Sequence, residues 1–196
     1  MQEFTDRQIE IMEAATNRIS KFGIQNLTIK TLAEDIGLSE PALYRHFKSK
    51  NEILLSLLAY FKSEMKNRIQ SLPFKPNNTE GDKLRAIFNS QLQTFINKPA
   101  IVSVIFAESI FHFDNSLSNK VSEIMDLMHQ YVKTNIEKGQ KDGTYNKLIG
   151  ASTLTTIILG GMRMTVLKWK ISGHKSNLMK DGTAVLEGIL KMIEKK

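Results

Sequence analysis

The stretch TIKTLAEDIGLSEPALYRHFKSK, residues 28–50, decides the fold of this chain. Thr28 and Ser39 are residue types that commonly begin helices, and Gly37 between them supplies a left-handed turn. The pattern therefore predicts two short helices joined by a tight turn, with another helix beginning directly afterwards. The second of these helices offers polar side chains outward, namely those of Tyr44, Arg45 and His46. That arrangement is typical of a helix-turn-helix, which places one helix in the major groove of DNA.

The flanking sequence carries equally clear helix signals. Thr5 and Gln8 have the spacing of a capping box, and Gly23 ends the first apolar-periodic stretch. Ser49 and Glu52 form a second box, which opens a long helix towards residue 69. Consecutive helix starts of this kind predict a compact, all-helical head.

The remainder of the chain also has helical periodicity. Pro73, Pro76 and the pair Asn77-Asn78 indicate a loop over residues 72–79. Further helices are expected over 84–98, 101–111, 117–139, 150–171 and 182–195. The expected fold is all-α with about nine helices, in which a helix-turn-helix domain over residues 1–48 precedes a helical body over residues 49–196.

Composition argues against several other functions. The chain has no Cys, no Gly-rich phosphate loop and no G-x-S-x-G or H-E-x-x-H motif, so we expect no enzyme, no cofactor and no metal site. The longest apolar run, 154–167, is too short and too charged to span a bilayer. No secretory signal is visible, which together with the lack of Cys favours a cytoplasmic location.

The net charge of +7 suggests an anionic partner but does not locate its site. Residues 1–50 hold seven Lys or Arg and seven Asp or Glu, whereas residues 151–196 hold eight and three. What distinguishes the head is a local cluster, because Arg45, Lys48 and Lys50 fall within a short segment without an acid. At physiological salt, screening weakens the attraction between a charged side chain and a phosphate beyond about 8 Å. The local cluster therefore matters more for DNA binding than the net charge of the chain.

Residues 5–62 resemble the N-terminal head of TetR-family transcriptional regulators. The matching residues are Thr28, Leu32-Ala33, Gly37-Leu38-Ser39, Leu43-Tyr44, His46-Phe47 and Lys48-Ser49-Lys50. More weakly, residues 158–173 are similar to the penultimate helix of some members. The resemblance implies a homodimer whose heads bind double-stranded operator DNA, and whose bodies dimerise through the last two helices and enclose a ligand pocket. Ligand entry is then expected to move the fourth helix and change the distance between the heads.

The resemblance and the chemistry of the side chains together predict a DNA-binding set: Thr28, Lys30, Ser39, Glu40, Pro41, Ala42, Tyr44, Arg45, His46, Lys48 and Lys50. Tyr44 suits a phosphate or a thymine methyl, and His46 and Lys50 suit the DNA backbone. Thr28 and Ser39 could act on DNA or could simply cap their helices. Glu40 could accept from a cytosine amino group, or it could turn to solvent or pair with a nearby cation.

The resemblance also supplies candidates in the body. Apolar and His residues that could line a ligand pocket are Phe61, Met65, Phe88, Leu92, Phe95, Phe106, His112, Met125, Met128, His129 and Met162. Taken singly, an aromatic or Met residue at helical spacing is more often a core packing residue. The expected dimer interface contains Leu154, Ile157, Leu186, Ile189 and Ile193. Glu108 and His112 share a helical face, which favours a salt bridge at a helix end over a metal site.

The predicted function is a ligand-responsive transcriptional regulator, most simply a repressor that binds a palindromic operator as a homodimer. A small-molecule inducer that is largely apolar would release it, and no membrane partner is expected. The alternative is a helical ligand-binding or protein-interaction dimer that no longer reads DNA. The zero net charge of residues 1–50 and the acidic Glu40 are what support that alternative.

Overall fold

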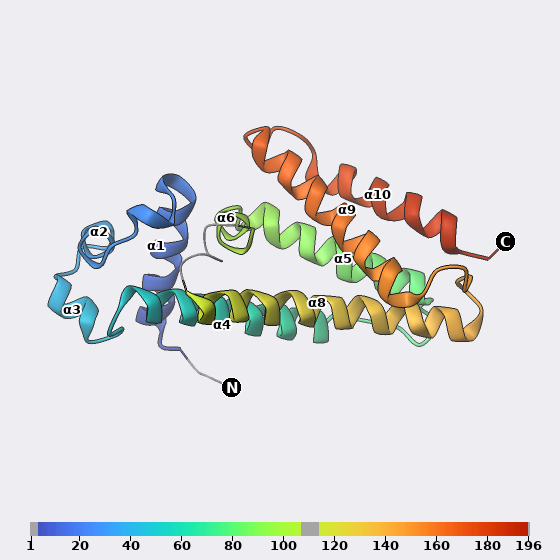
Figure 1. Cartoon of the computed structure of the whole chain (residues 1–196), viewed down its shortest axis with the longest axis horizontal. Helices are drawn as coiled ribbons and strands as arrows, with labels where there is room; N and C mark the ends of the chain where they lie inside the picture. The colour runs from blue at the N-terminus through green and yellow to red at the C-terminus, as the bar shows by residue number, and fades with distance from the viewer. Residues whose placement is uncertain (1–3, 107–113, 196) are drawn as a thin grey trace. The chain divides into compact units, whose positions relative to one another are not determined.

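The computed structural model describes residues 4–106 and 114–195 of the chain. Within these ranges the structure contains nine α-helices, one short 3-10 helix and no strand beyond an isolated bridge between Tyr145 and Glu194 (Figure 1). The predicted all-α fold is therefore confirmed. The chain divides into two compact units: residues 1–66 with 100–124, and residues 67–99 with 125–196.

The first unit contains the predicted head. Its elements are α1 (Asp6–Phe22), η1 (Ile24–Asn26), α2 (Ile29–Asp35), α3 (Glu40–Tyr44), most of α4 (Lys50–Gln70), α6 (Ala100–Ile105) and the start of α8 (Asn115–Asp142). Helix α6 packs on α1, where the Ser103 hydroxyl donates to the Ser20 hydroxyl at 3.2 Å. Apolar side chains from α1 to α4 form the core of this unit, among them Ile11, Leu32, Leu43, Phe47 and Leu57.

Local capping explains why these helices begin and end where they do. Thr5 and Gln8 form the predicted capping box, with Gln8 N donating to Thr5 Oγ1 at 3.3 Å. Gly23 ends α1 with φ of 80°, a conformation that costs glycine little. The box predicted at Ser49 forms only in part. Glu52 N donates to Ser49 Oγ at 3.1 Å, but the Glu52 carboxylate accepts from Lys48 N.

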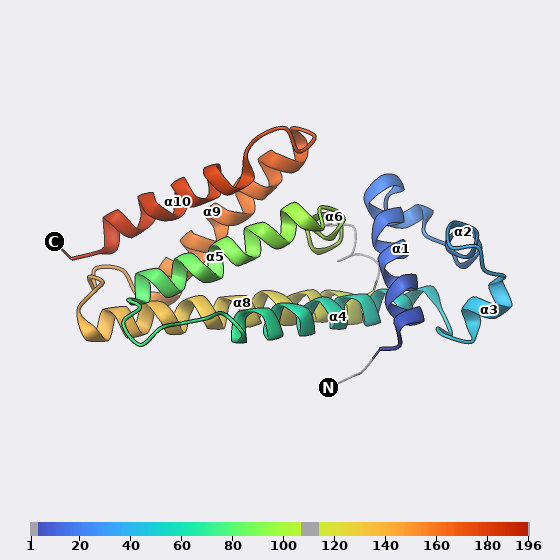
Figure 2. The ribbon, with the colours of Figure 1, turned by 180° about the vertical axis from the view of Figure 1, so that it is seen from behind.

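The second unit contains the end of α4, α5 (Glu80–Asn97), the remainder of α8, α9 (Ala151–Ile171) and α10 (Leu178–Ile193). Helix α10 packs against both α9 and α5, as Figure 2 shows from behind. Gly182 permits the close approach to α5, because a Cβ there would lie 2.4 Å from Leu92 Cδ1. Arg85 joins α5 to α10 by donating from Nε to Glu187 Oε1 at 2.6 Å and from Nη2 to Glu187 Oε2 at 2.9 Å.

Three of the predicted helix boundaries were wrong, for different reasons. Helix α5 begins at Glu80 and not at residue 84, because Thr79 caps it. Helix α8 passes through Gly139 to Asp142, since Gly139 is needed for space and not as a terminator. A Cβ at Gly139 would lie 2.2 Å from the Tyr145 ring. Helix α10 begins at Leu178, earlier than expected, because Asn177 caps it by accepting from Lys180 N at 2.9 Å.

Two further expectations concern the helix over 101–111 and the membrane. Helix α6 covers the first part of the predicted segment, and residues 107–111 lie outside the described residues. Among the described residues, no helix has both the length and the apolar character that crossing a bilayer requires.

Candidate nucleic-acid interface and body cleft

Helix α3 is short, and it is fixed by a cap at its N-terminus and by buried side chains on one face. Ser39 Oγ accepts from Ala42 N at 3.3 Å, and Pro41 occupies the first turn, where a missing N–H does no harm. Leu43 and the following Phe47 are buried and anchor the segment to the core of the first unit. Tyr44, in contrast, is 50% exposed. The local sequence thus buries one side of α3 and leaves its polar side free for a partner.

The predicted DNA-binding residues lie where a partner could reach them. Eight are exposed: Thr28, Lys30, Ser39, Glu40, Pro41, Tyr44, Arg45 and Lys48. Ala42, His46 and Lys50 are partly buried. All eleven belong to the segment formed by α2, α3 and the start of α4. This placement is compatible with the predicted DNA contacts, which themselves remain a prediction.

Thr28 and Ser39 both act as helix caps. Thr28 forms a capping box with Thr31, whose N donates to Thr28 Oγ1 at 3.1 Å. Because capping satisfies backbone N–H groups that would otherwise lack a partner, it accounts for both residue types without DNA. A second role in contacting the DNA backbone stays a prediction.

Lys50 has an unexpected partner. Its Nζ donates to the carbonyl oxygen of Ile24 at 2.9 Å, which ties the start of α4 to η1. Burial lowers the pKa of Lys50 from its ordinary value. Lys48, two residues earlier, has an exposed side chain. Lys48 is therefore more available to a phosphate than Lys50, whose predicted phosphate contact would compete with the Ile24 hydrogen bond.

One structural ion pair in the head was missed from the sequence. Arg18 Nη1 donates to both carboxylate oxygens of Asp35 at 2.7 Å, and the same group also donates to the carbonyl of Thr31 at 3.3 Å. These bonds hold α1 against α2. Seventeen residues separate the two partners, and no local pattern marks a pair at that separation.

The predicted ligand-pocket residues divide into four groups. Most are buried: Phe61, Met65, Phe88, Leu92, Phe95, Met128 and Met162. Phe106 and His129 are partly buried, and His112 lies outside the described residues, as does Glu108. Met125 is 51% exposed on α8, so it does not belong to the buried interior. Phe61, Met65 and Phe106 belong to the first unit, and the seven described candidates from Phe88 to Phe95 and from Met125 to Met162 belong to the second.

The expected interface residues need a similar correction. Leu154, Leu186, Ile189 and Ile193 are buried by packing inside the second unit, so in the single chain they are core residues. Ile157 alone of that set is exposed, at 44%. The periodicity of α9 and α10 identified apolar residues correctly, but packing of α10 against α9 and α5 within the second unit accounts for most of their burial. The exposed apolar residues are instead Met164, Leu167 and Ile171 on α9 and Met192 on α10.

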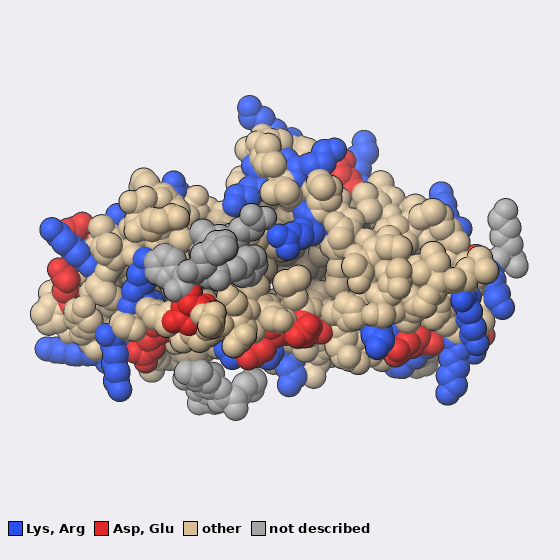
Figure 3. Space-filling view, viewed as in Figure 1, with Lys and Arg blue, Asp and Glu red and all other residues tan. Residues whose placement is uncertain are grey.

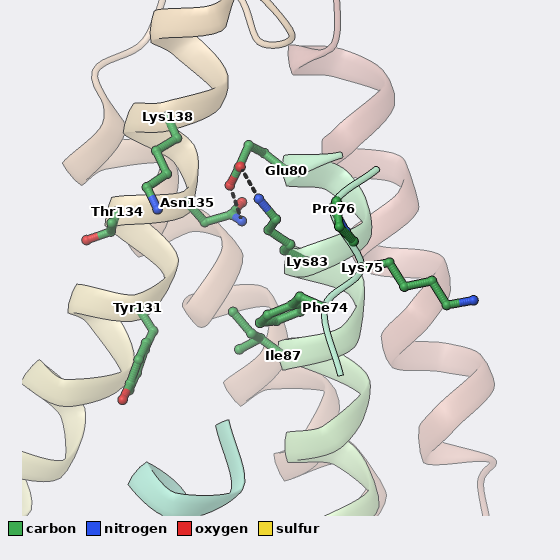
Figure 4. A pocket seen from close by; sticks show the side chains of 10 residues that line it. All are labelled: Phe74, Lys75, Pro76, Glu80, Lys83, Ile87, Tyr131, Thr134, Asn135 and Lys138. Atoms are coloured by element: carbon green, nitrogen blue, oxygen red, sulfur yellow. Dashed lines mark hydrogen bonds and ion pairs between the residues drawn. The ribbon is translucent and has the colours of Figure 1, made fainter. Parts of the chain in front are cut away.

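A cleft of about 490 Å³ lies within the second unit, between the loop before α5, α5 itself and α8 (Figure 4). Its walls include Phe74, Ile87 and Tyr131, and its polar residues include Glu80, Lys83 and Asn135. None of the predicted ligand residues lines it. No sequence pattern predicts this cleft, because its two walls lie far apart along the chain.

The floor of the cleft is a small polar network. Glu80 Oε1 accepts from Lys83 Nζ at 2.6 Å, and Glu80 Oε2 accepts from Asn135 Nδ2 at 2.9 Å. The other amide atom of Asn135, Oδ1, is buried and has no hydrogen-bond partner within the described chain. An unsatisfied buried acceptor costs about 1–3 kcal/mol.

Asp114 forms hydrogen bonds with neighbouring residues of the fold. Its carboxylate accepts from the Ser116 hydroxyl and backbone N–H and from Asn51 Nδ2 at 2.9 Å. The Ser116 bonds lower the pKa of the Asp114 carboxyl from its ordinary value. Within the described residues, no group of three or more His, Cys, Asp or Glu side chains is placed to hold a metal ion.

Comparison with known sequences assigns the two parts of the chain to one family. The family model described as "Bacterial regulatory proteins, tetR family" matches residues 11–57. A second, described as "YsiA-like protein, C-terminal region", matches residues 58–192. The chain belongs to the TetR family. The resemblance seen in the sequence is therefore confirmed, and this TetR-family chain is a DNA-binding regulator and not an enzyme.

Individual relatives of this TetR-family chain are distant. The nucleoid occlusion factor SlmA of Yersinia pestis is 26% identical over 140 residues, which cover 70% of each chain. Among solved structures, the fatty acid degradation regulator FadR from Bacillus halodurans has a TM-score of 0.83 at 16% identity, covering 96% of this chain and 97% of that one.

Two other similar structures contain ligands. FadR from Bacillus subtilis, in complex with stearoyl-CoA, has a TM-score of 0.77 at 20% identity and covers 93% of this chain and 97% of its own. A regulator from Saccharomonospora viridis, in complex with choline, has a TM-score of 0.83 at 20% identity and covers 97% and 99%. At these identities the likeness shows the fold alone.

Proposed function

We propose that this TetR-family regulator is a repressor that binds a palindromic operator as a homodimer and is released by a largely apolar small molecule. The observation that carries the proposal is the construction of α3. Its underside is buried by Leu43 and Phe47, while Tyr44 and Arg45 are exposed beside it. A short helix fixed in this way can enter a major groove without rearranging its own core. A cytoplasmic location accompanies this function.

The exposed residues suggest two kinds of contact with DNA. Arg45 can donate two hydrogen bonds to one guanine, while Tyr44 and Lys48 can contact phosphates or a thymine methyl. Two heads in a dimer would contact half-sites one helical turn apart, about 34–36 Å. Lys and Arg side chains are visible around the end of the first unit in Figure 3.

The exposed apolar face of α9 supports a homodimer. Ile157, Met164 and Ile171 recur every seven residues, so they lie along one side of the helix, and Ile171 is 76% exposed. Gly160 belongs to the same helix and has open space above it, which permits a close approach by a second backbone. A row of exposed apolar residues of this kind is typical of a protein interface. A two-fold dimer would cover it with the same row of a second copy.

The buried residues of the second unit favour an apolar inducer. Phe88, Leu92 and Phe95 on α5 and Met128 on α8 are buried. Aromatic and flexible apolar side chains of this kind suit an alkyl chain. Stearoyl-CoA, present in the similar FadR structure, is therefore the first candidate to test. Choline, present in another relative, is the polar comparison. An inducer acts through its difference in affinity for the two head arrangements, typically about 1–3 kcal/mol.

A mobility shift with the DNA upstream of the chain's own coding region tests the proposal. The wild-type chain is expected to shift a discrete palindromic site, with an affinity that falls steeply as salt rises. Arg45→Ala should weaken specific binding by about 1–3 kcal/mol, through the loss of one base contact. Lys21→Ala removes an exposed cation from α1 and is the matched control for net charge. Failure to bind any such duplex at low salt would leave the chain as a helical interaction protein.

Glu40 provides a separate test of base recognition. It is exposed in the first turn of α3, where the helix N-terminus favours a carboxylate. If Glu40 accepts from a cytosine amino group, Glu40→Ala should relax preference at one position by about 1–3 kcal/mol. An unchanged operator preference, measured by competition between single-base variants, would assign Glu40 to solvent.

Release by ligand completes the test. Stearoyl-CoA is expected to reduce the fraction of shifted operator at a fixed protein concentration, whereas choline should not. The Leu92→Ala variant should respond less to stearoyl-CoA. Release of the operator by choline alone would contradict the proposed apolar inducer while leaving the DNA contacts intact.

A further inference from the structure

The cleft between the loop before α5, α5 and α8 has the features of a binding site and lies wholly within the second unit. Its volume of about 490 Å³ falls in the range of small-molecule sites, about 300–1,000 Å³. One side is formed by Phe74, Pro76 and Ile87, and the facing side by Tyr131 of α8 (Figure 4). Walls of this kind accept a flat or alkyl body.

The floor of the cleft specifies a hydrogen bond. Asn135 is 5% exposed, and its Nδ2 donates to the carboxylate of Glu80. This bond fixes the orientation of the amide, because the reverse orientation would place an oxygen against a carboxylate. Oδ1 is consequently an acceptor without a partner in the described chain. A group that donates from N–H or O–H would satisfy it.

The charged side chains at the cleft indicate which charge a ligand should carry. The carboxylate of Glu80 is already neutralised by Lys83, whose Nζ lies 2.6 Å away. Lys138 follows Asn135 by one helical turn, and its exposed side chain also lines the cleft. Figure 4 shows the Lys138 side chain running along α8 towards Asn135, whereas Lys75 points away from the cleft. Among the described residues that line the cleft, the positive charge left for a ligand is therefore that of Lys138.

We propose that this cleft is a second ligand site, which takes a small amphipathic anion with an aromatic or alkyl body and one hydrogen-bond donor. The body lies between Phe74 and Tyr131, the donor bonds to Asn135 Oδ1, and the anionic group faces Lys138. The proposal goes beyond the repressor function, because it uses none of the residues assigned to DNA, to the dimer or to the apolar inducer.

Anilinonaphthalene sulfonate has the required chemistry and serves as the probe: two aromatic systems, a sulfonate and one N–H. Its N-methyl derivative carries a methyl group in place of the N–H hydrogen and so cannot donate. Both are titrated by calorimetry into the full chain without DNA. The wild type should bind one probe per chain, with the parent compound several-fold tighter than the N-methyl derivative. In Asn135→Leu that preference should disappear, which is the signature of a direct coupling.

Lys138→Glu should weaken binding of the parent compound by about tenfold, because a carboxylate then faces the sulfonate. Lys141→Glu is the matched control, since Lys141 is also exposed on α8 but does not line the cleft. It should change the affinity by less than about twofold. This pair decides the matter even if Asn135→Leu does not fold, which circular dichroism will show.

Two results would overturn the proposal: equal losses in Lys138→Glu and Lys141→Glu, or an unchanged preference for the N–H compound in a folded Asn135→Leu variant. Either would mean that the probe binds elsewhere on exposed apolar surface. A chain that binds the probe as expected but shifts no DNA would instead remove the repressor function and leave this site standing.

Discussion

The helix starts of the head and the polar pairs that join helices of the body depend on interactions of different range. In the head, Thr5, Thr28 and Ser39 each cap a helix through a partner three residues away. In the body, Arg85 bonds to Glu187 across 102 residues and Glu80 bonds to Asn135 across 55. Short-range interactions are visible in a sequence, whereas long-range pairs appear only once the helices have packed. The proposed functions follow the same division, since the head presents a surface and the body forms a cleft.

Removing the anchor of α3 tests this difference most strongly. Leu43 is fully buried, so Leu43→Ala should lower the free energy of unfolding by about 2–5 kcal/mol and abolish operator binding. Leu186→Ala, an equally buried leucine on α10, should lower stability to a similar extent. Urea unfolding and the mobility shift measure the two properties. If Leu43→Ala bound DNA normally below its unfolding transition, α3 would not be the recognition element.

The close contact between Gly139 and Tyr145 should give the next largest effect. Alanine normally favours a helix over glycine by about 1 kcal/mol, but a Cβ at Gly139 meets a rigid ring 2.2 Å away. Gly139→Ala should therefore destabilise the chain by about 1–3 kcal/mol.

Gly188→Ala is the control, because Gly188 lies in α10 and a Cβ added there would meet nothing within 4 Å among the described residues. It should stabilise the chain by up to about 1 kcal/mol. Chemical unfolding at one protein concentration compares the two variants. Equal effects of the two alanines would mean that Tyr145 moves aside at little cost.

The sequence predicted the fold class, the family and most helix starts, because each rests on local chemistry. It misplaced the end of the helix through Gly139, since glycine as a terminator and glycine as a space-saver look alike until Tyr145 is in place. It assigned Leu186 and Ile193 to a dimer interface, because periodicity identifies an apolar side but not the helix that covers it. The cleft at Asn135 escaped notice for a related reason: its walls come together only through packing.

Lys48 and Lys50 allow a comparison within the head between a lysine that stabilises the fold and one that is available to DNA. Lys50→Met removes the hydrogen bond to Ile24 and should cost roughly 1 kcal/mol of stability. Lys48→Met should leave stability unchanged, because the side chain is exposed. It should instead reduce the salt dependence of operator binding by about one unit of slope. Thermal unfolding and a salt titration of the mobility shift distinguish the roles, and a reversal of the two outcomes would exchange them.

The smallest expected effect comes from a capping box in the body, at the start of α5. Hydrogen bonds from the Thr79 backbone and hydroxyl lower the pKa of the Asp82 carboxyl from its ordinary value of 3.8. Because the pKa of Asp82 is lowered in the folded state, the ionised carboxylate stabilises folding at pH values above the pKa of the unfolded chain. This contribution is lost as the pH falls through the pKa of the folded chain.

Asp82→Asn keeps an acceptor for Thr79 but cannot titrate. The loss of stability on acidification below about pH 4 should therefore be smaller in Asp82→Asn than in the wild type. Asp181→Asn, in the first turn of α10, removes a carboxylate from a helix without a capping box and is the control. Urea midpoints measured above and below that pH provide the comparison. An acid limb that is identical in the wild type and in Asp82→Asn would show that this local cap contributes nothing through its charge.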